Sequence, residues 1–195
     1  MRRGRSGPAP YAVVAMSSAC ALRVGAFGLV MVVGLFACSA KADDPRVELS
    51  DVGFTLHLPP AMQQALDAFA PGFRAVRATS FRSDVSQAAA ATGTGGMAAA
   101  FASVGDYDHD GTIDAVVEGT SPGDSALRVI AIRNGPQPTA TEVTRFPVYD
   151  ADAVGVYLTN PPKGTAGGFE VVDYPDSTLV FEFKDGVFTG RNIGS

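Results

Sequence analysis

The stretch "GDYDHDGTIDAVVEG", residues 105–119, carries four aspartates within nine positions and then changes to mainly apolar residues. Carboxylates this close repel one another, so the cluster needs a compensating positive charge. Asp106, Asp108, Asp110 and Asp114 follow the spacing D-x-D-x-D-G-x-x-D. Alternate acids on a tight loop suit Ca²⁺, which takes six to eight oxygens at about 2.3–2.6 Å. The stretch therefore predicts a calcium loop that leads directly into a strand.

The other loop residues agree with this interpretation. Gly111 permits a sharp turn after the third aspartate, and Asp114 closes the cage as the chain enters the strand. The predicted ligands are the side chains of Asp106, Asp108, Asp110 and Asp114 and the backbone carbonyl of Thr112. No His or Cys occupies a ligand position, which makes zinc a poor candidate. An EF-hand needs a glutamate at its twelfth position, where this chain has Val117, so a full EF-hand is not supported.

The loop resembles the calcium loop of FG-GAP and VCBS repeat proteins, where Gly-Asp-aromatic-Asp-x-Asp-Gly-x-x-Asp runs straight into a β-strand. Gly105 and Tyr107 match that pattern together with the aspartates and Gly111. Such families usually build propellers from many blades, but we find one loop here, so a propeller is not expected. Residues 53–190 are similar to small exported bacterial proteins of unassigned role that carry one such loop. The resemblance implies bound calcium, and the alternative is an aspartate-rich turn without metal.

Short apolar segments separated by turn residues follow the loop. They predict strands at residues 113–119, 126–134, 141–149, 154–159, 168–173 and 177–183. Asp185-Gly186 then predicts a tight hairpin into residues 187–190. Strands so close together in sequence leave no room for crossover helices, so the sheet should be antiparallel.

The segment before the loop is mixed. It predicts a strand at 53–59, a helix at 60–70, a strand at 73–81, a short helix from Ser83 and then a glycine-rich loop. Pro60 suits the first turn of its helix, and Pro71-Gly72 ends it. We therefore expect one α+β domain over residues 53–195, in which the early helix packs on a meandering antiparallel sheet.

The N-terminal residues predict an export signal. Four arginines precede the uncharged apolar run Val24–Phe36, which as a helix would be about 20 Å long. The hydrocarbon core of a membrane is about 30 Å thick, so the run is typical of a signal peptide and not of a membrane span. The alternative is a buried core helix.

The residues after this run resemble the bacterial lipobox, since Leu35, Ala37 and Cys38 fit its pattern. The resemblance implies a lipoprotein signal peptide over residues 1–37 and lipidation of Cys38. Residues 38–52 are then a polar tether. The alternatives are a Cys20–Cys38 disulfide and, for the leader, a start at Met16.

The charge after Cys38 is strongly negative. All 20 acidic residues follow it, against 11 of the 15 basic ones, which gives 11 − 20 = −9. An acidic domain argues against nucleic acid and against electrostatic docking on anionic lipid. Ser39 resembles the residue preferred for sorting to the outer membrane. We therefore expect a lipid-anchored envelope protein, at the outer membrane and facing the periplasm, with an unidentified protein or glycan partner.

Catalytic residues are hard to find. The imidazoles are His57, on the polar side of a strand, and His109, between loop ligands. An acid–base pair would have to come from strand carboxylates, for which surface charge is the default: Glu118, Glu170, Asp173 and Glu182. The favoured function is a calcium-stabilised, non-enzymatic lipoprotein domain that serves as an envelope binding module. The alternative is an envelope hydrolase with a carboxylate-based site.

Overall fold

The fold was determined as a computed structural model. It describes residues 44–50, 53–91, 98–147, 154–159 and 168–194. Strands account for 53% of these residues and helices for 17%. The strands form three antiparallel sheets of two, six and four strands.

The six-stranded sheet holds the acidic loop. Its strands are β3 (Arg74–Ala75), β4 (Ala98–Ala99), β5 (Ala102–Gly105), β6 (Asp114–Thr120), β7 (Ala126–Arg133) and β8 (Thr139–Pro147). Strands β4 to β8 pair in sequence order, and β3 pairs with the end of β6. Gly105 pairs with Asp114, so the acidic loop closes the hairpin between β5 and β6.

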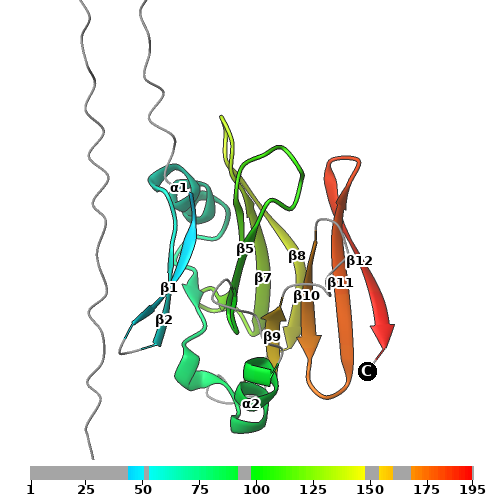
Figure 1. Ribbon diagram of the computed structural model, residues 1–195. Coiled ribbons are helices and arrows are strands. Elements are labelled where there is room, and N and C mark those ends of the chain that lie inside the picture. The colour runs from blue at the N-terminus through cyan, green and yellow to red at the C-terminus, as the bar shows by residue number, and fades with distance from the viewer. Residues whose placement is uncertain (1–43, 51–52, 92–97, 148–153, 160–167, 195) are drawn as a thin grey trace, which may run out of the picture. The chain divides into compact units, whose positions relative to one another are not determined.

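The four-stranded sheet follows in the chain. It consists of β9 (Val156–Thr159), β10 (Gly168–Asp173), β11 (Ser177–Lys184) and β12 (Val187–Gly194). Figure 1 shows β10, β11 and β12 side by side in orange and red. Asp185 and Gly186 have φ angles of 52° and 84°, as a tight hairpin turn requires. This turn confirms the hairpin predicted from the Asp-Gly pair.

The smaller elements precede the acidic loop. They are β1 (Arg46–Ser50), β2 (Gly53–His57), α1 (Pro60–Phe69), the 3₁₀ helix η1 (Ala78–Ser80) and α2 (Ser83–Ala91). Strands β1 and β2 form the two-stranded sheet, so part of the stretch expected to be a tether is a strand. The predicted strand at 73–81 is wrong for most of its length, because only Arg74–Ala75 (β3) forms a strand there and the 3₁₀ helix η1 follows.

The predicted α+β class is wrong: the described chain is mostly β, with three antiparallel sheets, and is not a helix packed on one sheet. The reason lies in β6, whose residues from Asp114 to Gly119 are all buried. Successive strand residues point to opposite faces, so this sheet needs cover on both sides. The ten residues of α1 span only about 15 Å and cannot supply it.

One hydrophobic core joins the sheets. Val117 of β6 belongs to it together with Met62 and Leu66 of α1 and Phe169 of β10. Phe169 stacks on Phe181 of β11, with ring centroids 5.3 Å apart. The acidic loop therefore leads into a strand that belongs to the core.

Candidate metal centre

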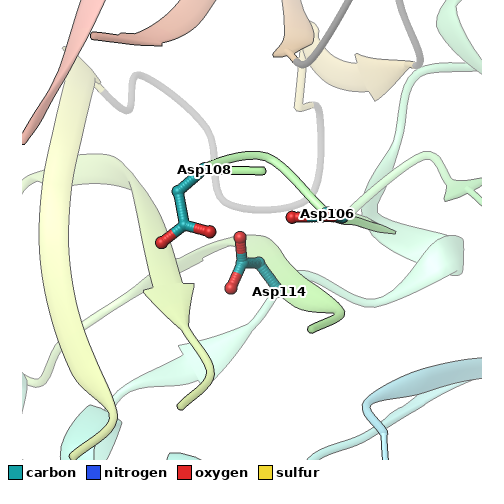
Figure 2. A group of neighbouring side chains, drawn as sticks. All are labelled: Asp106, Asp108 and Asp114. Atoms are coloured by element: carbon teal, nitrogen blue, oxygen red, sulfur yellow. The ribbon is translucent and has the colours of Figure 1, made fainter. Parts of the chain in front are cut away.

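Three of the loop carboxylates converge. Asp106, Asp108 and Asp114 each place one carboxylate oxygen within 4.8 Å of the other two. Figure 2 shows these side chains pointing into one common space. Asp106 and Asp108 come from the loop, whereas Asp114 is the first residue of β6. The sequence spacing thus brings together three oxygen donors of the kind that hard cations prefer.

The loop backbone is tightly turned. His109 and Gly111 have φ angles of 61° and 86°, in the left-handed region that favours glycine. Gly111 donates its N–H to Asp106 Oδ2 at 3.1 Å, and Asp110 donates its N–H to Asp108 Oδ1 at 3.2 Å. These bonds aim the two carboxylates inward. His109 is exposed, as expected for a position between ligands.

Asp114 is the most deeply buried residue of the three. Its side chain is 1% exposed and accepts hydrogen bonds from the backbone N–H groups of Tyr107 at 3.1 Å and Asn134 at 2.8 Å. Burial raises the pKa of this carboxyl to about 6, and the nearby charges of Asp108 and Asp110 also act to raise it. The protein thus holds a carboxylate where its negative charge is unfavourable without a cation.

One carboxylate oxygen of Asp106 is unsatisfied. Its Oδ2 accepts the bond from Gly111, but its Oδ1 is buried and has no hydrogen-bond partner among the described residues. A buried carboxylate oxygen without a partner costs free energy, which a bound cation would offset. Asp106 therefore fits a metal ligand.

Asp108 forms an ion pair with an arginine of β7. Its side chain is only 8% exposed, and its Oδ2 lies 3.4 Å from Nη1 of Arg133. The guanidinium carbon of Arg133 lies 5.0 Å from the centre of the Phe183 ring, an arrangement typical of a cation–π contact. Arg133 thus supplies one positive charge at the cluster and links it to β11.

Asp110 and Thr112 do not belong to the group of three converging carboxylates. Asp110 is exposed, and its Oδ1 accepts bonds from the N–H and the hydroxyl of Thr112 at 2.8 and 2.5 Å. These bonds lower the pKa of Asp110. The structure therefore groups three of the five predicted ligand residues and pairs the other two with each other.

Tyr107 anchors the loop in the core. Its side chain is 3% exposed, its hydroxyl lies 2.7 Å from that of Ser103, and its ring packs edge-on against Phe169 at 5.4 Å. Burial raises the pKa of this phenol. An aromatic residue between two loop aspartates therefore ties the cluster to both sheets.

Two contributors could not be found from the loop pattern. Arg133 and Asn134 are 25 and 20 residues from their partners Asp108 and Asp114. The register explains their position, because Ala115 pairs with Ile132 and so sets the end of β7 beside the start of β6. Only the pairing of the strands predicted at 113–119 and 126–134 could have indicated these two residues.

The other candidate residues are dispersed. His57 Nε2 lies 3.1 Å from Glu48 Oε2, and Glu182 lies 3.6 Å from Arg191. Glu118 is fully buried, and Glu170 is 8% exposed. Burial raises the pKa of Asp173. The lipidation candidate, Cys38, lies outside the described residues.

The fold and the cluster define a β-rich domain with an acidic hairpin loop whose ligand chemistry suits a hard divalent cation. Comparison of the chain with protein-family models, with curated proteins and with solved structures finds no match. In the described ranges, no helix is long and apolar enough to cross a membrane.

Proposed function

We propose that this chain is a calcium-stabilised, non-enzymatic lipoprotein domain of the cell envelope, and that it serves as a binding module. The observation that carries the calcium assignment is the convergence of the Asp106, Asp108 and Asp114 carboxylates, together with the buried Oδ1 of Asp106, which has no hydrogen-bond partner among the described residues. Burial of like charges is unfavourable in itself, and a divalent cation converts their repulsion into shared attraction. The loop spacing supports the same metal.

Isothermal titration calorimetry tests the calcium site directly. We expect one Ca²⁺ per chain with a Kd of roughly 10⁻⁴ to 10⁻³ M, the range of extracellular calcium modules. Mg²⁺ should bind much more weakly, because it demands near-ideal octahedral geometry and dehydrates reluctantly. Such affinity suits permanent loading in a calcium-rich medium. No heat of binding at millimolar Ca²⁺ would remove the basis of the proposal.

Arg133→Gln is expected to tighten calcium binding by about three- to tenfold, because the guanidinium beside Asp108 repels the incoming cation. The partial exposure of Arg133 keeps the effect modest. The matched control is Arg191→Gln, which removes an equal charge from an exposed position on β12. Equal calcium affinities in the two variants would show that Arg133 does not act on the site.

Cys38→Ser is expected to abolish membrane anchoring. The lipobox resemblance implies that the mature chain begins at a lipidated Cys38, and two or more acyl chains anchor a protein stably. Detergent phase partitioning with mass spectrometry of the N-terminus measures this. Cys20→Ser, inside the expected signal peptide, should leave anchoring unchanged. Unprocessed protein free in the periplasm with an unmodified cysteine would contradict the prediction.

A further inference from the structure

A second site lies between the two-stranded sheet and the six-stranded sheet. It is a cavity of about 450 Å³, bounded by β2, α1, the segment from β3 to η1, Phe101 just before β5, and β6. This volume falls in the range of about 300–1,000 Å³ typical of small-molecule sites. Val117 of β6 lines the cavity. Asp114 lies three residues earlier on the same strand, and because strand residues alternate between faces, its side chain points to the opposite face. The cavity is therefore separate from the metal centre.

The walls of the cavity are preformed. The N–H of Val76 donates to the carbonyl oxygen of Glu118 at 3.0 Å, which holds the segment after β3 against β6. Gly119 permits this close approach, because a Cβ there would lie 2.2 Å from the carbonyl oxygen of Arg74. Leu66 of α1, itself 5% exposed, closes another side. A ligand would thus enter an existing cavity, with little ordering cost.

The lining combines apolar side chains with three uncharged polar ones, Thr55, Gln63 and Thr79, and a single charged one. Phe73, Phe101 and Leu58 lie among the apolar residues that line it, and Phe54 lines it while remaining 39% exposed. Arg77 is the one charged residue among the lining residues, and it is exposed. No carboxylate in the described ranges forms an ion pair with it.

From this arrangement we propose that the cavity binds a single-chain amphiphile with an anionic head group. The alkyl chain lies against the phenylalanine and leucine side chains, where burial contributes about 25 cal/mol per Å² of apolar surface. The carboxylate or phosphate head lies at the mouth, where the planar guanidinium of Arg77 accommodates two acceptor oxygens. This inference does not depend on the calcium site.

The test compares ligands that differ only in the head group. Decanoate, decyl phosphate, decanol and decylamine are titrated below their micellar concentrations and followed by chemical shifts of residues around the cavity. We expect decanoate or decyl phosphate to bind at least about tenfold more tightly than decylamine, because the cationic head meets Arg77. The first two ligands distinguish a carboxylate from a phosphate head group.

Three variants make the test decisive. Arg77→Gln should remove the preference for the anionic head group and retain binding of decanol. Arg74→Gln, an equal change at an exposed neighbour outside the lining, should leave the preference intact. Ala75→Phe, which places a ring in the cavity from β3, should abolish binding of all four. The proposal is overturned if none binds the unaltered protein, if Arg77→Gln keeps the preference, or if Ala75→Phe still binds.

Discussion

Millimolar calcium is expected to raise the melting temperature of this domain by several degrees relative to the protein in chelator. A ligand that binds only the folded state stabilises it by RT ln(1 + [L]/Kd), which is about 1.4 kcal/mol at the roughly tenfold excess that millimolar calcium gives over a Kd of about 10⁻⁴ M. For a domain of this size, each 1 kcal/mol shifts the melting temperature by about 2–4 °C. Since Asp114 begins the buried strand β6, the cation would stabilise the core itself.

The control variants separate the metal from general effects of charge. Asp108→Asn should abolish the calcium-dependent shift, because it removes one of the three converging carboxylates. Asp124→Asn, at an exposed position whose Oδ1 accepts a bond from Ala126 N–H, should keep the full shift. Magnesium should act much less than calcium. Identical melting curves in calcium and in chelator would leave the cluster an ordinary polar turn.

Asp114 also has a structural role, so a substitution of Asp114 is not suitable for this comparison. Its carboxylate accepts two backbone N–H bonds, from Tyr107 and Asn134, and so closes the loop even without a cation. Replacing it by alanine would leave both donors without that acceptor and cost stability in chelator as well. Asp108 is therefore the better position for measuring the contribution of the metal alone.

Local signals predicted the elements that depend on neighbouring residues. The helix α1 begins at Pro60, as predicted, and the Asp185-Gly186 turn joins β11 to β12. The passage from the acidic loop into a strand was also visible, because Gly111 and the following apolar residues lie next to one another in sequence. Each of these features depends on preferences over a few residues.

The number of sheets depends on distant pairing, and the sequence pattern did not reveal it. A run of apolar residues such as that in β6 is compatible with a strand covered on one face or on both. Strand β5, "ASVG", is composed of residues with mostly weak β-propensity and is strand because β6 pairs with it. The same limit applied at the candidate metal centre, where the pairing of β6 with β7 places Arg133 beside Asp108.

Glu118→Gln is expected to stabilise the protein at neutral pH, increasingly so as the pH rises. Glu118 is fully buried in β6, and neither of its carboxylate oxygens has a hydrogen-bond partner among the described residues. Burial raises the pKa of this carboxyl well above its ordinary value. Glutamine has nearly the same volume and does not ionise in either state, so the variant removes the titration while largely keeping the packing.

The sign follows from proton linkage. In the unfolded chain the carboxyl of Glu118 ionises near its ordinary pKa of about 4.3, whereas in the folded protein it stays protonated to higher pH. Between these two pKa values the folded state holds the extra proton, so the free energy of unfolding falls by about 1.4 kcal/mol per pH unit as the pH rises. Stability linked to Glu118 is thus fully present below pH 4 and is lost above it.

Urea unfolding in chelator at pH 5, 6 and 7 measures the effect. The difference in unfolding free energy between Glu118→Gln and the unaltered protein should grow by about 2–3 kcal/mol from pH 5 to pH 7 while the folded carboxyl stays protonated. Glu182→Gln is the matched control, since that side chain is 46% exposed beside Arg191. If both variants follow the pH dependence of the unaltered protein, Glu118 is ionised in the folded state, and the core must supply it with a partner or with water.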